Sequence, residues 1–231
     1  MKQLVLAAVL LAPIGGPTEP ASIMNGVVIT SRDGVKLKGT YFAPGRPGPG
    51  IVLFHQCDGS SRGSWGGFPG QLAAVGFHVL TFDNRGTGES GRGREAAANI
   101  VGDAEAAYSW LVWQKDVDKS RMAAGGASCG VAQAANLAAG HPQIKALVLL
   151  SGLVPGSPMK YLATAPGVAV FGASSTGDMG AGNVEDVARA SKHPQSTAKR
   201  YPSGGAHGVG MFARDPDLRP SIVQWLQGVM K

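Results

Sequence analysis

Short apolar runs rich in β-branched residues alternate with longer Ala-rich stretches along most of this chain. Two expected strands, over residues 27–30 and 35–42, flank Asp33-Gly34, a dipeptide typical of hairpin turns. Fully apolar runs are typical of strands that are buried on both faces of a parallel sheet. Such runs predict further strands over residues 51–54, 77–82, 122–124, 144–150 and 168–171, and a last, more polar strand is expected over 197–201.

Helices are expected between these strands. Apolar residues recur at three- and four-residue spacing over residues 95–113, which predicts an amphipathic helix. Further helices are expected over 68–75, 129–139, 184–191 and 216–230, with a short helical turn over 159–163. A hairpin followed by repeated strand–helix units predicts an α/β fold, with a mostly parallel eight-stranded sheet and helices on both faces. No linker divides residues 22–231, so we expect one domain.

The first residues have the pattern of a secretory signal peptide. Lys2 is followed by an apolar run over residues 4–12 and then by small residues and prolines. This run is shorter than the roughly 20 residues that span a bilayer. We therefore expect residues 1–21 to be a signal peptide and the protein to be secreted or periplasmic, although Glu19 is an unusual residue so close to a cut after Ala21. The alternative is an apolar first strand.

Composition and charge narrow the classes of function. The chain of 231 residues is 44% hydrophobic and 16% charged, with a formal net charge of +6. Its basic residues are dispersed, and the tightest group, Arg85, Arg92 and Arg94, lies among glycines in one loop. A nucleic-acid interface would need a basic stripe or helix face. We expect no nucleic-acid partner, and no membrane bundle, because no apolar run beyond the first residues reaches about 18 residues.

Parallel sheets bind ligands beyond the carboxyl ends of their strands, so the residues after each strand are site candidates. The strand over 122–124 is followed by Gly126-Ala127-Ser128-Cys129-Gly130, a G-x-S-x-G sequence. In this motif the glycines permit a sharp turn from strand to helix that exposes a serine hydroxyl. A second match, around Ser61, lies inside a loop. Only Ser128 stands between a predicted strand and a predicted helix, so Ser128 is the candidate nucleophile.

A serine hydroxyl is a weak nucleophile unless a base accepts its proton and an acid orients that base. In strand–elbow–helix enzymes the acid follows the serine along the chain and the histidine follows the acid. The acids that follow Ser128 and precede the last histidine are Asp178, Glu185 and Asp186. Asp178 follows an expected strand through a loop of small residues. The other two begin a predicted helix, where carboxylates are favourable as N-terminal charges, so we predict Asp178 as the acid.

The base must follow Asp178, which leaves two histidines. His193 lies at a predicted helix end, where an imidazole can interact with the terminal carbonyls. His207 lies in a glycine-rich loop over residues 203–208, where a histidine has little purpose in packing. We predict His207 as the base. His55 precedes the nucleophile, and we expect it to brace its own loop.

Two backbone N–H groups should stabilise the oxyanion that forms when the serine attacks a carbonyl. One belongs to the residue after the nucleophile, Cys129, and the other to the loop after the strand over 51–54, at Gln56 or Cys57. The chain has no other cysteines, so the expected site holds both. Export would permit a disulfide between them. We expect two small buried thiols instead, because a crosslink would constrain both donors.

A G-x-G-x-x-G sequence over residues 86–91 is the nominal fingerprint of a dinucleotide site. Such a site needs a helix that opens at the third glycine and an acid at the end of the next strand. Here Arg92 and Gly93 prolong the loop, and the next strand ends in Gly125-Gly126. We interpret the sequence as a loop and expect no dinucleotide cofactor.

Taken together, four stretches resemble the α/β-hydrolase superfamily over residues 25–231. They are LFHQCDGS, LTFDNRGTGES, GASCGV and the AHG loop before a C-terminal helix that contains Trp225. In size the chain is similar to dienelactone-hydrolase-like members, and residues 151–167 leave little room for the cap domain that many family members insert there. Dienelactone hydrolases have a cysteine nucleophile where Ser128 stands, which favours serine esterase chemistry over lactone specificity.

The resemblance implies cleavage of carboxylic esters or related acyl compounds, small molecules, through an acyl-enzyme intermediate. Ser128 would attack the carbonyl, His207 would act as base and Asp178 would hold the imidazole. No metal and no organic cofactor is implied. A peptidase, a thioesterase or a lactonase would use the same residues. A catalytically silent domain of this fold that binds a ligand or a partner is the alternative outside the enzymes.

Overall fold

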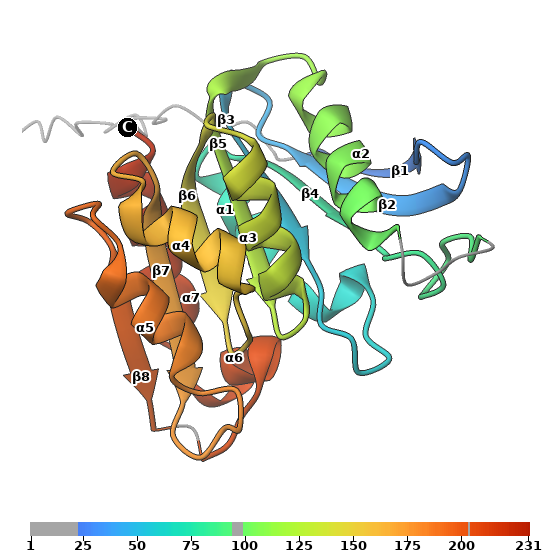
Figure 1. Ribbon diagram of the computed structural model, residues 1–231. Helices are drawn as coiled ribbons and strands as arrows, with labels where there is room; N and C mark the ends of the chain where they lie inside the picture. The colour runs from blue at the N-terminus through green and yellow to red at the C-terminus, as the bar shows by residue number, and fades with distance from the viewer. Residues whose placement is uncertain (1–22, 94–98, 203) are drawn as a thin grey trace, which may run out of the picture.

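The computed structural model describes residues 23–93, 99–202 and 204–231 (Figure 1). The expected signal peptide, residues 1–21, lies outside these ranges, as does most of the first turn of the helix expected over 95–113. None of the helices in the described ranges has the length and apolar character needed to cross a membrane.

The described strands form one eight-stranded sheet in the order β1-β2-β4-β3-β5-β6-β7-β8. The hairpin of β1 and β2 is antiparallel, β2 pairs antiparallel with β4, and every other neighbouring pair is parallel. The strands are β1 (Ile23–Thr30), β2 (Lys36–Ala43), β3 (Gly48–Phe54), β4 (His78–Phe82), β5 (Val117–Ala127), β6 (Ile144–Leu150), β7 (Ala169–Ser175) and β8 (Thr197–Tyr201). The predicted α/β class and mostly parallel sheet are confirmed.

Helices cover both faces of the sheet, which makes three layers (Figure 1). One face carries α2 (Ile100–Val112), α3 (Gly130–Gly140), α4 (Gly156–Thr164) and α5 (Asn183–Ala190). The other carries α1 (Phe68–Ala74) and α7 (Leu218–Val229), with the short α6 (Met211–Arg214) beside them. Two 3₁₀ turns, Arg62–Trp65 and Gly208–Gly210, precede α1 and α6.

The central strand β3 shows why the strand runs of this sequence are apolar without alternation. Val52 and Phe54 pack in the core under α2–α5, whereas Ile51 and Leu53 pack in the core under α1 and α7. All four side chains are fully buried. Each such burial stabilises the fold by about 1.5–3 kcal/mol, so both faces of the strand select apolar residues.

The structure corrects two expected strands. The strand expected over 122–124 is longer, because β5 starts at Val117 and ends at Ala127. Residues 172–175, expected to be a loop, are the end of β7 and pair with β8. Their small, partly polar side chains have low strand propensity. Small residues are needed at this strand end because α5 packs directly on it. A Cβ added at Gly172 would lie 2.1 Å from the carbonyl oxygen of Val184.

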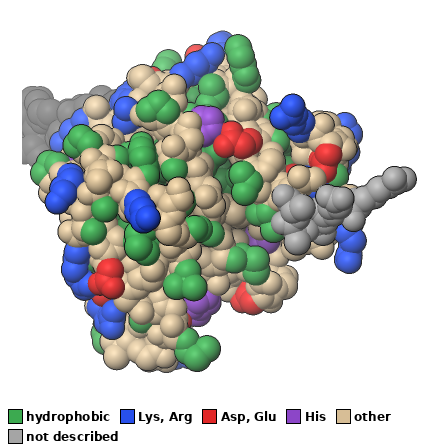
Figure 2. Space-filling view, in the orientation of Figure 1, with side chains coloured by type: hydrophobic (Ala, Val, Ile, Leu, Met, Phe, Trp, Pro, Cys, Tyr) green, Lys and Arg blue, Asp and Glu red, His purple; other side chains and the backbone are tan. Residues whose placement is uncertain are grey.

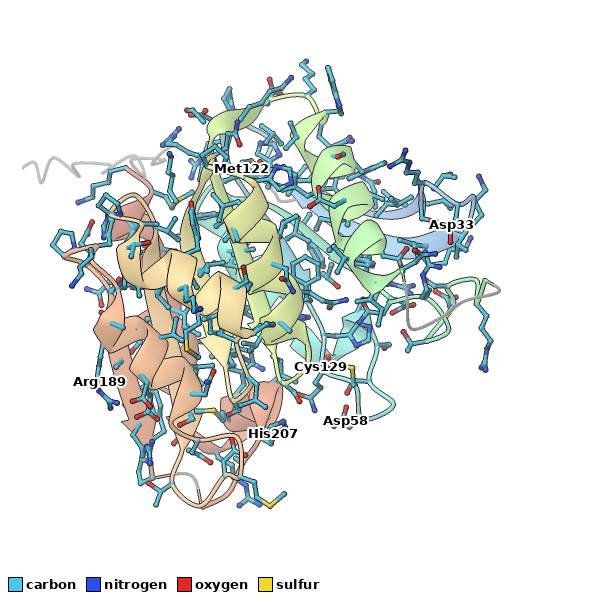
Figure 3. The ribbon with its side chains drawn as sticks, in the orientation of Figure 1. Asp33, Asp58, Met122, Cys129, Arg189 and His207 are labelled. Atoms are coloured by element: carbon cyan, nitrogen blue, oxygen red, sulfur yellow. A yellow bond between two sulfur atoms is a disulfide. The ribbon has the colours of Figure 1, made fainter. Side chains whose placement is uncertain are left out.

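The loops that follow the parallel strands lie together at one end of the sheet. In Figure 3 Asp58, Cys129 and His207 lie at this end, and Met122 lies at the opposite one. Between β6 and β7 the chain forms only α4, nine residues long. The expected absence of a large cap between these strands therefore agrees with the structure, and this end of the sheet is left open.

Candidate active site

Ser128 lies on a sharp turn between β5 and α3. Its backbone has φ of +53°, in the left-handed region that costs energy for residues with a side chain. The flanking glycines allow close packing: a Cβ at Gly126 would lie 2.1 Å from the Gly130 carbonyl oxygen, and a Cβ at Gly130 would lie 2.4 Å from that of Phe54. The G-x-S-x-G sequence thus forms the strand–turn–helix expected of it.

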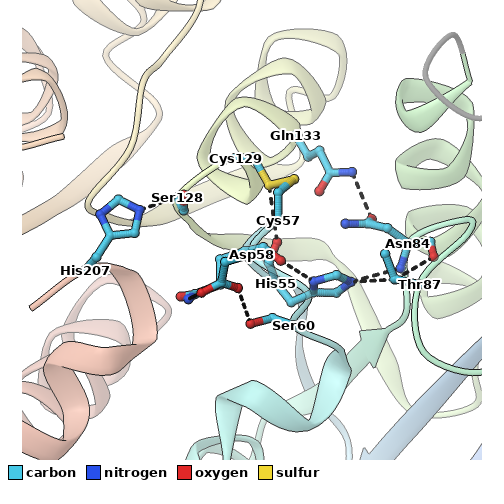
Figure 4. The surroundings of a disulfide bond; sticks show 11 residues. His55, Cys57, Asp58, Ser60, Asn84, Thr87, Ser128, Cys129, Gln133 and His207 are labelled. Atoms are coloured by element: carbon cyan, nitrogen blue, oxygen red, sulfur yellow. Dashed lines mark hydrogen bonds between the residues drawn. A yellow bond between two sulfur atoms is a disulfide. The ribbon is translucent and has the colours of Figure 1, made fainter. Parts of the chain in front are cut away.

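The structure brings together Ser128, His207 and Asp178, which come from the loops after β5, β8 and β7. Nε2 of His207 lies 2.7 Å from the Ser128 hydroxyl (Figure 4). Nδ1 of the same ring lies 2.9 Å from Oδ1 of Asp178. With the ring proton on Nδ1, the imidazole donates to the carboxylate and accepts from the serine. This tautomer is the one that a general base needs.

Asp178 is held in a nearly buried place, with 4% of its side chain exposed. The backbone N–H of Gly180 also donates to its Oδ1, at 3.1 Å. Burial raises the pKa of this carboxyl, but interactions with His207, Ser151 and the Gly180 N–H outweigh burial and hold the pKa below its ordinary value. Asp178 is therefore ionised next to the imidazole.

Neither rival acid reaches the histidine. Glu185 is buried and bonds to Ser174, Arg189 and Arg200. Burial raises its pKa, and these partners bring it below the ordinary value. Glu185 lies in the first turn of α5, as expected, and it also forms a buried ion pair with Arg200. Asp186 pairs with Arg189 at the surface.

The rival base, His193, is also placed elsewhere. Its Nδ1 accepts a hydrogen bond from the backbone N–H of Gln195, at 3.2 Å, in the turn after α5. It therefore stabilises a turn rather than the end of the helix.

His55 braces the loop after β3, as expected. The ring is fully buried, its Nδ1–H donates to the carbonyl oxygen of Gln56 at 2.6 Å, and the backbone N–H of Asn84 donates to its Nε2 at 3.0 Å (Figure 4). Burial lowers the pKa of His55, which favours this neutral form.

The same loop is fastened to the histidine loop through the Gln56 side chain. Its Oε1 accepts a hydrogen bond from the backbone N–H of Val209, at 3.1 Å. The backbone N–H groups of Gln56, Cys57 and Cys129 donate to no protein acceptor among the described residues. All three predicted oxyanion donors are thus free to bind a substrate oxygen.

The expectation of two free thiols is wrong: Cys57 and Cys129 form a disulfide, with their Cα atoms 5.9 Å apart (Figure 4). The reason is strand pairing. β3 and β5 are parallel neighbours in which Phe54 lies opposite Gly126. Cys57 follows Phe54 by three residues, and Cys129 follows Gly126 by three residues. In this protein the two chains stay close beyond the strand ends, so the cysteines fall within disulfide range, about 4.4–6.8 Å between Cα atoms.

Beside Ser128 the surface opens into a cleft of about 740 Å³. Its lining is mostly small or apolar, and Asp178, already bound to His207, is the charged residue in it. Leu153 and Met179 stand exposed at this cleft. Sequence reasoning missed these two residues, and no local signal distinguishes them from other loop residues. The lining residues are Ser128, Cys129, Ala132, Gly152, Leu153, Gly177, Asp178, Met179, Gly180, Gly205 and His207.

The glycine-rich loop over residues 86–91 wraps a carboxylate of the protein itself. Oδ1 of Asp83 accepts the backbone N–H of Arg62 at 2.7 Å, and Oδ2 accepts that of Glu89 at 2.9 Å. No helix opens at its third glycine in the described chain. The loop interpretation is confirmed.

Two other hollows of the described surface are lined by charged side chains that pair with one another, Arg62 with Asp83 and Arg85 with Asp33. Lys and Arg side chains lie apart from one another over the face shown in Figure 2. Within residues 23–93, 99–202 and 204–231, no three His, Cys, Asp or Glu side chains are grouped so that they could hold a metal ion.

Comparison with known proteins gives a family and a set of similar folds. A family model described as "alpha/beta hydrolase fold" matches residues 49–210. Two uncharacterized proteins of Mycobacterium tuberculosis, Rv2307c and MT2364, are each 37% identical over 147 residues, 60% of this chain and 50% of theirs. The matched part is thus half of the length of these relatives.

Among solved structures, the Pyrococcus furiosus esterase Pf2001 is similar with a TM-score of 0.71, at 19% identity, over 96% of both chains. A Pyrobaculum calidifontis esterase is similar with a TM-score of 0.69, at 19% identity, over 92% of this chain and 86% of that one. At such identities the likeness establishes the shared fold.

Proposed function

Because the chain belongs to the alpha/beta hydrolase fold family, we propose that it is a serine hydrolase that cleaves carboxylic esters through an acyl-enzyme intermediate. The observation that carries the proposal is the continuous hydrogen-bonded series from Asp178 through His207 to Ser128, whose serine stands on a strained turn. This series is open to a cleft on one side, as a substrate requires.

The proposed reaction has two steps. Ser128 Oγ attacks the carbonyl carbon while His207 Nε2 takes the hydroxyl proton, and Asp178 stabilises the imidazolium that forms. His207 then gives the proton to the leaving alkoxide, and the acyl group stays on Ser128. In the second step a water loses its proton to the same nitrogen and attacks the carbonyl of the acyl-enzyme. His207 then returns this proton to the departing Ser128 oxygen, which releases the acid and restores the serine.

The negative charge that develops on the carbonyl oxygen in each step needs donors already in place. The free N–H of Cys129 is one donor, and that of Gln56 or Cys57 is the other. Each such donor is worth about 10²–10³ in rate because it faces charge that exists only in the transition state.

The cleft supports a small, uncharged acyl substrate. Leu153 and Met179 offer apolar contact to a short chain, and no cap covers the remainder of a long one. Each methylene that stays in water forgoes about 0.8 kcal/mol of binding. Acetyl to butyryl esters should therefore be hydrolysed at least as efficiently as palmitoyl esters, with no activation when substrate droplets form. A strong preference for the longest chains would contradict this substrate class.

Covalent labelling tests the function directly. A fluorophosphonate probe should attach one group to the protein, and peptide mapping should find it on Ser128. The Ser128→Ala variant should take no label. A catalytically silent binding protein would stay unlabelled and would leave p-nitrophenyl acetate intact, and either result would overturn the proposal.

We further infer that the protein works in an oxidising compartment, secreted or periplasmic. The Cys57–Cys129 disulfide supports this inference, since such bonds persist outside the reducing cytosol. Expression in the native host, followed by fractionation, would contradict it if the protein stayed in the cytosol with both thiols reduced.

A further inference from the structure

Cys57 and Cys129 carry two of the backbone N–H groups to which the proposed function assigns the oxyanion. We propose that their disulfide is a positioning device for ester hydrolysis. The disulfide holds the N–H of Cys57 beside that of Cys129. The protein therefore turns over substrate at full rate only while these two cysteines are joined. This proposal rests on the proposed function, because it requires an oxyanion at this place.

The orientation of one peptide group points to Cys57 as the second donor. The carbonyl oxygen of Gln56 accepts the Nδ1–H of the buried His55 at 2.6 Å. In a trans peptide the N–H of the next residue points opposite to this carbonyl, so the Cys57 N–H is directed away from His55. Figure 4 shows His55 and Ser128 on opposite sides of Cys57. The Cys57 N–H is therefore directed away from His55, toward the side on which Figure 4 draws Ser128.

The elbow that carries Cys129 is fixed without the disulfide. The Ser128 N–H donates to the Leu150 carbonyl oxygen at 2.9 Å, which ties the turn to β6. Helix α3 begins at Gly130, which packs against the Phe54 carbonyl with no room for a side chain. The Cys129 N–H thus keeps its place whatever the state of its sulfur.

The segment that carries Cys57 is anchored only at its start, where Gln56 bonds to His55 and Val209. Cys57, Asp58 and Gly59 are exposed, and the hydrogen bonds of the Asp58 side chain go to Gln56 and Ser60 in its own loop. Within the described residues, the disulfide is the one covalent or hydrogen-bonded link from residues 57–60 to another segment. Without it the Cys57 N–H would be held only through the hydrogen bond that its own peptide carbonyl, that of Gln56, accepts from His55. The oxyanion would then have a less firmly placed donor.

The exposure of Cys57 makes the bond accessible to a dithiol reductant. A thiolate of the dithiol attacks one sulfur, the protein S–S bond breaks, and the other cysteine leaves as a thiolate. The second thiol of the reductant then attacks the reductant sulfur of the mixed disulfide, and the remaining protein cysteine leaves as a thiolate. The protein gains two thiols with the two protons and two electrons that the reductant loses as it becomes a cyclic disulfide.

The test compares kcat, KM and the pH–rate profile of oxidised wild type with those of Cys57→Ser/Cys129→Ser. We expect the kcat of the variant for p-nitrophenyl acetate to be about 10- to 100-fold lower. This decrease does not exceed the one caused by complete removal of an oxyanion donor, about 10²–10³-fold. KM and the pH profile should stay the same, because the Ser128–His207–Asp178 bonds do not pass through the disulfide. Ser60→Ala, which removes only a hydrogen bond within the loop, is the matched control and should keep wild-type kcat.

Dithiothreitol supplies a second measurement that does not depend on how the variant folds. Wild type reduced under native conditions, with an unchanged circular dichroism spectrum, should lose kcat to the same extent and regain it on reoxidation. The cysteine-free variant should not respond to the reductant. If reduced wild type keeps full kcat while its serine is still labelled by fluorophosphonate, the positioning role is overturned and the proposed function stands. If oxidised wild type takes no label at Ser128, both are overturned.

Discussion

Two segments of this protein share the sequence G-x-S-x-G and differ in almost everything else. Ser128 has φ of +53° between a strand and a helix. Ser61, with φ of −135° and ψ of 179°, is ordinary extended chain before a 3₁₀ turn. The glycines around Ser128 have no space for a Cβ, whereas a Cβ at Gly63 would meet only the Ser61 hydroxyl, at 3.6 Å. Packing requires both glycines at the Ser128 turn. Near Ser61, Gly59 is favoured only by its positive φ of 81°, and Gly63 has room for a side chain.

The residue after each serine completes the contrast. The N–H of Cys129 has no protein acceptor among the described residues, so it can bind an oxyanion. The N–H of Arg62 already donates to Asp83, at 2.7 Å. Ser61 itself forms no side-chain hydrogen bond with the described chain, and so has no base. A catalytic motif is therefore defined by the free groups around it rather than by its letters.

The largest expected effect separates the two serines. Ser128→Ala should lower kcat for p-nitrophenyl acetate by on the order of 10⁴-fold or more, because the attacking oxygen is gone. Ser61→Ala should retain wild-type kcat. The measurement is initial-rate kinetics on both purified variants. Activity in Ser128→Ala, or a label on Ser61, would reverse the assignment.

The second-largest expected effect on kcat comes from replacing the acid, Asp178. Asp178→Asn should keep the fold and lower kcat by about 10⁴-fold, because an amide favours the wrong tautomer of His207. Asp186→Asn, on the exposed face of α5, is the control and should keep both kcat and stability. Steady-state kinetics would contradict this assignment if Glu185→Gln proved the crippling change while Asp178→Asn stayed active.

The glycines offer a test of packing rather than chemistry. Gly126→Ala should destabilise the protein by about 3 kcal/mol, since the new methyl group would overlap the Gly130 backbone. Gly63→Ala, with open space for its methyl group, should stay within about 0.5 kcal/mol of wild type. Urea denaturation followed by circular dichroism measures both. Equal stability of the two variants would mean that the elbow is looser than described.

The smallest expected effect is a pH dependence that belongs to the Ser128 site alone. The folded protein holds the pKa of Asp178 below its ordinary value, about 3.9 in unfolded chains. The carboxylate therefore adds stability above about pH 4, and this contribution is lost as the pH falls through the folded pKa. Urea midpoints between pH 6 and pH 2 should decline more steeply in wild type than in Asp178→Asn. If the urea midpoints of the two proteins declined in parallel, the lowered pKa of Asp178 would be contradicted.

Sequence patterns predict the centre of this fold better than its strand ends. The run over 51–54 is recognisable because both of its faces are buried, so every residue is apolar. The first residues of β5 are different: Asp118 and Arg121 pair with each other at the surface, and nothing apolar marks them as strand. The end of β7 is hidden for another reason, since small residues are chosen there by the close approach of α5.

The residues of the candidate site also fall into those that the sequence predicts and those that it does not. Ser128, Asp178 and His207 could be named because a local motif and a fixed chain order restrict each choice. Leu153 and Met179 could not be named, because their role depends on which loops meet at the cleft. The disulfide also depends on neighbours: only the pairing of β3 with β5 places Cys57 and Cys129 within reach of each other.

The same crosslink changes the topology of the chain. It closes residues 57–129 into one covalent ring, which contains α1, β4, α2 and all of β5. A protease that cuts a single bond inside this ring, for example in the loop over residues 86–93, opens the ring without dividing the molecule. The piece with β1, β2 and β3 remains bonded through sulfur to the piece with α3 and everything after it. Such a nicked chain separates into two fragments only when the disulfide is reduced as well.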